Sequence, residues 1–202
     1  MAPSVSRQKE IGVKYKYGGL LTTLSYFYID QENIIDIDVG SGKYRRAADG
    51  RDKFKGVEWT VNGKLAPKWT VTGGLMYIDA KRDKTQGGKN DGRFVNGVAD
   101  WSGVLGLVYE PNDSLGIIGR VVWNDAAYID NSNAPSGKTK IPSYTIFDLG
   151  VNYKTHLGQI PVSLSAMCYN VTNKDYWMGR GSSTTFGLSM PRTFMLSARF
   201  EF

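Results

Sequence analysis

Apolar and polar residues alternate along most of this chain with a period of two, the pattern of a β-strand that has one face in an apolar environment. In the segment 9–17 the apolar positions are Ile11, Val13 and Tyr15, and the polar positions between them are Glu10, Lys14 and Lys16. Few stretches repeat every three to four residues, as a helix would. The pattern therefore predicts an all-β fold.

The alternation divides the chain into about nine strands joined by connections that are short and long in turn. The strands are expected at 9–17, 20–35, 43–65, 69–81, 100–110, 115–124, 141–154, 160–171 and 192–202. Short turns are expected near Gly18, Pro67, Pro111 and Gly158, and long loops near Gly40, Gly88, Asn131 and Arg180. Outer-membrane barrels have short periplasmic turns and long extracellular loops. The chain is therefore predicted to be an antiparallel transmembrane β-barrel segment in a bacterial outer membrane.

The odd number of strands indicates that the chain does not close into a barrel by itself. Bacterial single-chain barrels have an even number of strands, so nine would leave two unpaired edges. A larger barrel, of which this chain is an incomplete part, is the leading interpretation. Two alternatives stay open: a small autonomous barrel of eight or ten strands acting as a passive pore or adhesin, and a soluble β-sandwich.

Composition agrees with a membrane barrel. The chain has 24 Gly, 12 Tyr and 5 Trp, which favours strands and turns. It contains no run of about 18 apolar residues, and its mean hydropathy of −0.32 is mild, as expected when strands alternate between lipid and lumen. The segment Met1–Lys9 lacks the apolar core of a signal peptide. We therefore expect that a leader was removed or that the sequence begins inside a longer chain.

The end of the chain resembles the signal that the outer-membrane assembly machinery reads. Alternate residues of the last segment form an apolar stripe that ends at the terminal residue: Phe194, Leu196, Ala198, Phe200 and Phe202. Such a stripe suits a strand facing lipid, with the last aromatic ring at the membrane interface.

Charge and reactive residues narrow the function. The net charge is +6, but Lys and Arg are interspersed with Asp and Glu, so no nucleic-acid partner is expected. The single cysteine, Cys168, and the single histidine, His156, predict neither a disulfide nor a metal site. Catalytic motifs are absent, so no enzyme is predicted. Basic loop residues could bind an anionic chelate or lipopolysaccharide phosphates, or could simply be solvated; they are Lys81, Arg82, Lys84, Lys89, Arg93, Lys138 and Lys140.

Four phrases resemble the C-terminal barrel region of TonB-dependent siderophore receptors of the ferrichrome, ferrioxamine, coprogen and pyoverdine type. They stand in the family's order, and together the likeness covers essentially the whole chain. The phrases are Gly56-Val57-Glu58-Trp59, Ile141-Pro142-Ser143-Tyr144 continuing to Phe147-Asp148-Leu149-Gly150, Tyr169-Asn170-Val171-Thr172-Asn173-Lys174-Asp175-Tyr176-Trp177, and Pro191-Arg192-Thr193-Phe194.

The resemblance implies a plugged barrel of about 22 strands. Residues 1–202 would be the C-terminal portion of that barrel, and the plug domain and the N-terminal barrel half are absent from the sequence. The implied function is uptake of ferric siderophores, energised by TonB through the missing plug. Iron would arrive only as the siderophore chelate, so no cofactor is expected. Outer-membrane lipid and lipopolysaccharide are the other expected partners.

A wrapped iron chelate needs aromatic surfaces and hydrogen-bond donors rather than metal ligands. The candidate ligand contacts at the extracellular strand ends are Trp123, Tyr128, Tyr176, Trp177 and Arg180, with Tyr77 and Trp101 as further candidates. Aromatic residues at strand ends more often form the interfacial girdle, which we favour for Trp59, Trp69, Trp101 and Tyr153.

Overall fold

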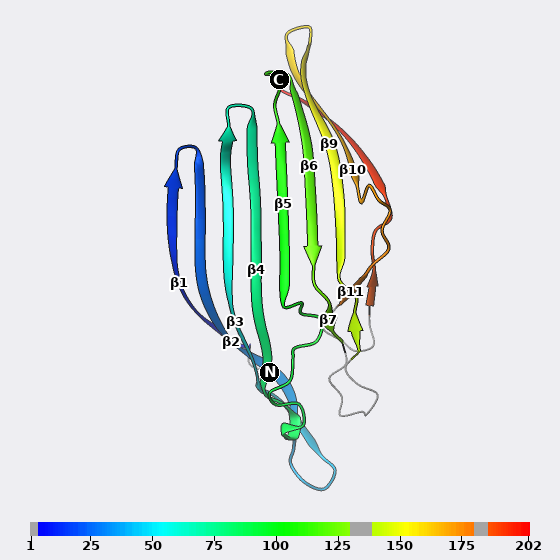
Figure 1. Ribbon diagram of the computed structural model, residues 1–202. Coiled ribbons are helices and arrows are strands. Elements are labelled where there is room, and N and C mark those ends of the chain that lie inside the picture. The colour runs from blue at the N-terminus through cyan, green and yellow to red at the C-terminus, as the bar shows by residue number, and fades with distance from the viewer. Residues whose placement is uncertain (1–3, 130–138, 180–185) are drawn as a thin grey trace.

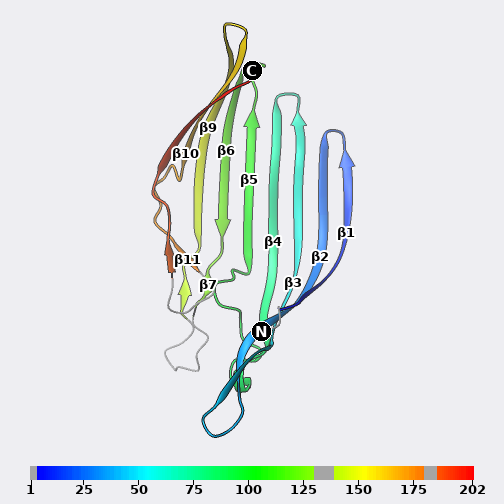
Figure 2. The same ribbon diagram turned by 180° about the vertical axis from the view of Figure 1, so that it is seen from behind.

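The computed structural model describes residues 4–129, 139–179 and 186–202, and its main feature is one nine-stranded antiparallel sheet (Figures 1 and 2). The strands of this sheet follow one another in chain order, with two short hairpins, β7–β8 and β11–β12, left outside it. In spatial order the strands are β1 (Ser6–Tyr17), β2 (Leu20–Asp38), β3 (Tyr44–Ala66), β4 (Trp69–Lys84), β5 (Trp101–Tyr109), β6 (Leu115–Asn124), β9 (Tyr144–Leu157), β10 (Ile160–Tyr169) and β13 (Thr193–Phe200). The predicted number of strands is confirmed for the described residues.

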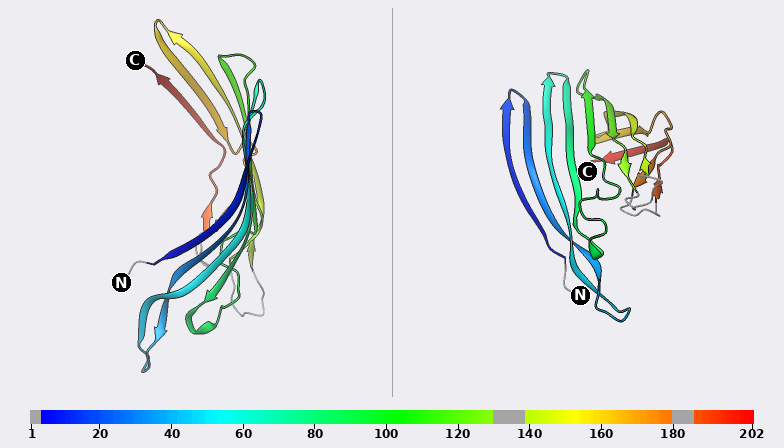
Figure 3. Two further views of the ribbon diagram at one scale, coloured as in Figure 1. Left: turned by 90° about the vertical axis from the view of Figure 1, so that its left-hand side faces the viewer. Right: turned by 60° about the horizontal axis from the view of Figure 1, so that its bottom comes forward.

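The sheet is curved like part of a barrel wall, and it stays open (Figure 3). Within the described ranges, β1 and β13 each have one unpaired edge. Two small hairpins accompany the sheet: β7 (Ala127–Tyr128) with β8 (Lys140–Ile141), and β11 (Trp177–Gly179) with β12 (Phe186–Leu188). The described parts contain neither a closed cylinder of eight or ten strands nor a second large sheet. The fold therefore matches the larger-barrel interpretation.

Short turns gather at one end of the sheet and long connections at the other, as predicted. Gly18 and Gly158 lie in two of the short turns with φ of +55° and +64°, a conformation that glycine adopts without steric cost. At the opposite end, which we call the loop end, β2 and β3 run on as a long hairpin beyond the other strands (Figure 1). No described helix is long and apolar enough to cross a membrane.

The strand register separates the side chains into two faces. One row of register partners crosses β1 to β5 and is apolar or aromatic throughout: Ile11, Tyr26, Val57, Tyr77 and Trp101. The same face continues to β13, where Phe194 and Leu196 are among the most exposed side chains. Neighbouring residues on the opposite face are largely polar, such as Asn62 and Thr72, which hydrogen-bond across strands. We therefore assign the apolar face to lipid and call it the outward face, and the other the inward face.

A small core lies on the inward face near the loop end. Phe27, Ile78 and Ala80 are buried there, and Val95 and Val98 from the β4–β5 connection pack against them. Gly56 makes this packing possible. A Cβ at this position would collide with the Tyr77 carbonyl oxygen and would lie 2.6 Å from the Phe27 ring. Steric crowding thus explains why the Gly56-Val57-Glu58-Trp59 phrase begins with glycine.

Candidate functional site

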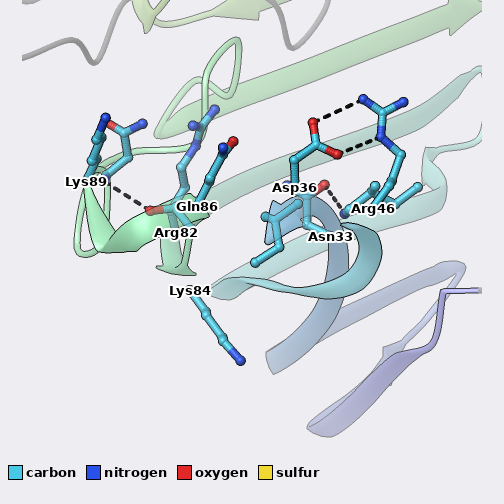
Figure 4. A pocket seen from close by; sticks show the side chains of 11 residues that line it. Asn33, Asp36, Arg46, Arg82, Lys84, Gln86 and Lys89 are labelled. Atoms are coloured by element: carbon cyan, nitrogen blue, oxygen red, sulfur yellow. Dashed lines mark hydrogen bonds and ion pairs between the residues drawn. The ribbon is translucent and has the colours of Figure 1, made fainter. Parts of the chain in front are cut away.

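The first group of candidate functional residues forms a pocket at the loop end, which we call the rim pocket (Figure 4). It lies between the protruding β2–β3 hairpin and the connection after β4, which contains the short 3-10 helix η1 (Gln86–Gly88). The cavity has a volume of about 410 Å³. Its polar lining comes mainly from Asn33, Asp36, Arg46, Arg82, Gln86 and Lys89.

One pair of charges in the rim pocket neutralises itself. The guanidinium of Arg46 donates to both carboxylate oxygens of Asp36, with Nε–Oδ1 at 2.9 Å and Nη2–Oδ2 at 3.2 Å. These hydrogen bonds hold the pKa of Asp36 below its usual value. Both side chains are exposed beyond the apolar band, so this pair shapes the pocket wall rather than offering free charge.

Arg82, Lys84 and Lys89 are the other cations of the rim pocket, and Lys84 is paired with Asp49 at 2.6 Å. Nε of Arg82 is buried and has no hydrogen-bond partner among the described residues. Arg82 is the register partner of Asp52, whose Oδ2 accepts from Asn33 Nδ2 at 3.1 Å while Oδ1 is buried and unsatisfied. A buried donor and a buried acceptor without partners favour a polar ligand group or bridging water at this point.

A second group presents aromatic rings on the inward face. The rings of Tyr144 and Tyr176 are stacked with centroids 4.0 Å apart. Asn124 Nδ2 donates to the Tyr144 hydroxyl at 3.0 Å, and the backbone N–H of Tyr176 donates to Ser189 Oγ at 3.1 Å. The stacking on Tyr144 and the hydrogen bond to Ser189 therefore hold Tyr176 in place. Because Tyr144 is an inward residue of β9, this stacking places the predicted ligand contact Tyr176 on the inward face.

A buried polar network fixes the segment that carries Tyr176. The Asp148 carboxylate is only 1% exposed and accepts from Arg120, with Nε–Oδ2 and Nη2–Oδ2 both at 2.7 Å. Its other oxygen accepts from the backbone N–H of Asn170 at 2.7 Å. The Asn170 side chain then donates to the carbonyls of Lys174 and Met190 and accepts from the Lys174 N–H. We call Arg120, Asp148 and Asn170 the loop anchor.

Sequence reasoning did not identify the loop anchor, although the signal was present. Asp148 lies in the Phe147-Asp148-Leu149-Gly150 phrase, and Asn170 lies in the phrase that ends at Trp177. A lone acid on an inward strand position and an asparagine at a strand end do not reveal their pairing. The two meet only because β9 and β10 are neighbours.

Two predicted ligand contacts lie on the outward face, away from Tyr176. The Trp123 ring packs near Leu75 where Gly103 leaves space on the apolar face. Tyr128 stacks on Phe94, with ring centroids 4.6 Å apart. The sequence placed both residues near the right strand ends but could not assign the face of Tyr128, which lies outside the nine-stranded sheet. Both rings therefore face away from the lumen, where an imported ligand would pass.

The other predicted aromatic residues are also placed. Tyr77 and Trp101 are outward neighbours with centroids 5.0 Å apart, consistent with an interfacial girdle. Trp59, Trp69 and Tyr153 lie on the same outward face. Trp177 lies in β11 and is half exposed. Its ring meets the Phe186 ring edge-on, with ring centroids 6.3 Å apart. Arg180, Lys138 and the loop centre Asn131 lie outside the described residues.

Nothing in the described residues resembles a metal centre. No group of three His, Cys, Asp or Glu residues there could hold an ion. His156 lies at the far end of β9, near the short turn at Gly158. The arrangement at the loop end offers aromatic surface, hydrogen-bond donors and positively charged side chains.

Comparison with known proteins identifies similar receptors. The chain is 29% identical over 203 residues to the ferrichrome receptor FcuA of Yersinia enterocolitica, covering 98% of this chain and 26% of that protein. It is 28% identical to the ferripyoverdine receptor of Pseudomonas aeruginosa, covering all of this chain and 26% of that protein. The chain thus spans about a quarter of the length of these relatives.

A solved structure shows the same fold. The ferric preacinetobactin receptor BauA of Acinetobacter baumannii superposes with a TM-score of 0.83 at 28% identity, over 98% of this chain and 29% of that one. The family model described as "TonB dependent receptor-like, beta-barrel" matches residues 1–171. The chain therefore belongs to the β-barrel family of TonB-dependent receptors, which are proteins of the bacterial outer membrane.

Proposed function

We propose that this chain supplies the C-terminal part of the barrel wall of a receptor that imports ferric siderophores with energy from the TonB complex. The similar proteins include receptors for ferrichrome and ferripyoverdine. Because the chain covers about a quarter of their length, contact with TonB would be made by a plug domain elsewhere in the receptor.

The observation that carries this proposal is the separation of the two faces. The outward face is apolar from β1 to β13, whereas the inward groups able to recognise a ligand gather at the loop end. A passive pore needs no such gathering. A receptor for a wrapped chelate needs aromatic surface and a few well-placed polar groups.

Within that receptor we propose two ligand-contact regions. Arg82 and Lys89 in the rim pocket attract the anionic part of the chelate. Tyr176, held against Tyr144 by the loop anchor, offers a flat apolar surface, and half-exposed Trp177 follows it in the chain. Iron enters as part of the substrate and contacts no protein ligand.

We also propose that the final strand is recognised by the outer-membrane assembly machinery. Phe194, Leu196 and Phe200 project from the outward side of β13, and Phe202 follows the strand fully exposed. The free edge of β13 is available for pairing with another strand. An exposed edge with an apolar side is suited to such recognition.

Uptake of radioactive iron by iron-starved cells that produce the complete receptor tests the transport proposal. Cells should be given hydroxamate, catecholate and mixed siderophores separately, with and without a protonophore that abolishes TonB energisation. The proposal expects uptake of at least one class that stops with the protonophore. Uptake of none, or uptake that persists without energy, would contradict it, and the latter result would favour a passive pore.

A further inference from the structure

Arg82 is held differently from the other cations that line the rim pocket. Arg46, on the hairpin side of the pocket, is paired with Asp36 (Figure 4). Lys84 is paired with Asp49. None of the ion pairs among the described residues includes Arg82. Its guanidinium therefore brings a positive charge to the pocket that no described acid neutralises by direct contact.

The surrounding structure also fixes the position of Arg82. Its backbone N–H donates to the Arg93 carbonyl at 2.8 Å, and its own carbonyl accepts from the Gly92 N–H at 2.8 Å. The side chain leaves β4 on the inward face, two residues beyond buried Ala80, and its Nε is buried. Lys89, by contrast, is exposed on the connection after β4. Because Arg82 is already ordered, it loses less conformational entropy on binding a ligand than a free lysine does.

The side chains beside Arg82 leave its guanidinium available. Asp52 is its register partner, but the Asp52 carboxylate does not bind it: Oδ2 accepts from Asn33 Nδ2 at 3.1 Å, and Oδ1 has no partner. The remaining polar lining includes the amides of Gln86 and Asn90. Cations and amides thus outnumber the acceptors of the pocket, whose one acid already pairs with arginine. Such a lining favours a ligand group that is rich in acceptor oxygens.

The size of the rim pocket limits what it can hold. Its volume of about 410 Å³ lies toward the lower end of the range for small-molecule sites, roughly 300–1,000 Å³. An iron chelate that wraps its metal is itself a drug-sized ligand, of which sites normally enclose most of the surface. The pocket is therefore suited to one side arm of such a ligand, and the iron-wrapping part would lie outside it in the lumen.

We propose that Arg82 selects ferric chelates that carry a free carboxylate on a side arm, and that the rim pocket receives this arm. The planar guanidinium matches a carboxylate because it can donate two parallel hydrogen bonds to the two oxygens. A neutral amide offers one acceptor oxygen and no charge, so it binds the same group more weakly. This inference rests on the proposed transport function and deepens it by naming the class of chelate.

The test uses two pairs of synthetic ferric chelates, one pair built on a trihydroxamate and the other on a tricatecholate. Within each pair, one chelate has a succinyl arm that ends in a carboxylate, and the other has a succinamide arm that ends in a neutral amide. The iron coordination is the same in both. Equilibrium binding to the complete receptor is measured in detergent. In one pair or both, we expect the succinyl chelate to bind about tenfold more tightly, as for a hydrogen bond between charged groups.

Variants of Arg82 assign the preference to this residue. R82Q should bind the succinyl chelate about tenfold more weakly and the succinamide chelate almost unchanged, so that the preference disappears. R82K keeps the charge but lacks the planar fork, and we expect an intermediate loss of about threefold. The matched control is K81Q, which removes a positive charge from the neighbouring residue on the outward face and should keep the preference.

Heat-modifiable migration on a gel confirms that each variant is folded. If R82Q does not assemble, the comparison of R82K with K81Q decides. Equal affinity for both members of each pair, absence of binding by all four chelates, a preference that survives in the Arg82 variants, or an equal loss in K81Q would overturn the inference. Energised uptake of another iron chelate alongside any of these results would reject the carboxylate arm and leave the transport function standing.

Discussion

Two segments at the loop end, the β2–β3 protrusion and the segment after β10, are held in opposite ways. The protrusion is a β-hairpin whose Arg46–Asp36 ion pair lies at the surface. The segment after β10 has little regular structure but is fixed by the buried Asp148 carboxylate. Exposed pairs individually contribute little, whereas breaking a buried one is costly. The protrusion should therefore tolerate single substitutions that the second segment does not.

The largest effect should follow from removing the centre of the loop anchor. Asp148→Ala leaves the Asn170 N–H without its acceptor and Arg120 without its partner. We expect a loss of about 3 kcal/mol of unfolding free energy, the low end for buried pairs, because Arg120 is nearly half exposed. Urea-induced unfolding in detergent measures this loss, and proteolysis should cleave near residue 175. Asp148→Asn keeps an acceptor oxygen for the Asn170 N–H and should lose less unfolding free energy than Asp148→Ala. Equal losses in the two variants would contradict the account.

A smaller effect is expected below the protrusion, where packing rather than charge is involved. In Gly56→Val the new side chain meets the Tyr77 carbonyl and the Phe27 ring. Overpacking of this kind costs about 1–3 kcal/mol. Gly106→Val is the matched control on an inward position of β5, since a Cβ there meets only ordinary contact at 3.6 Å. The same urea unfolding should show little change for the control, and a loss as large as that of Gly56→Val would refute the steric explanation.

A smaller effect is expected on siderophore binding, which should depend on the inward face and not on the outward face. Tyr176→Ala removes the inward ring stacked on Tyr144, and we expect siderophore affinity to fall about tenfold, as for the loss of one good stacking contact. Trp123→Ala removes an outward ring of similar size and should leave affinity unchanged. Equilibrium binding to the complete receptor in detergent gives both values. A larger loss in Trp123→Ala would show that the faces are assigned wrongly.

The smallest effect concerns the exposed pair of the protrusion. Arg46→Gln removes the hydrogen bonds that lower the pKa of Asp36, so this pKa should return toward 3.8. A carboxylate with a lowered folded pKa stabilises the fold above its unfolded value and loses that contribution as the pH falls through the folded pKa. At neutral pH the rate of proteolysis at the hairpin tip should rise less than about twofold. This increase should vanish well below pH 3.8.

The nine-stranded sheet could be predicted from the sequence because alternation acts locally. The range 115–124 expected for one strand is the observed extent of β6, and the Gly18 and Gly158 turns lie where glycine predicted them. Longer-range features could not be obtained in this way. The loop anchor joins residues 22 and 28 positions apart, and the outward direction of Tyr128 depends on its contact with Phe94. Such pairings follow from tertiary contact, which no local pattern encodes.

The central claim, that one face of the sheet meets lipid and the other the lumen, is tested most directly by spin labels along β9. After replacement of Cys168 by alanine, single cysteines are labelled at Leu149 and Val151 on the outward side and at Gly150 and Asn152 on the inward side. Collisions with oxygen, which dissolves in lipid, and with a water-soluble nickel complex are then measured in bilayers. The account predicts that oxygen accessibility is high at 149 and 151 and nickel accessibility is high at 150 and 152. Uniform accessibility, or the reverse alternation, would contradict it.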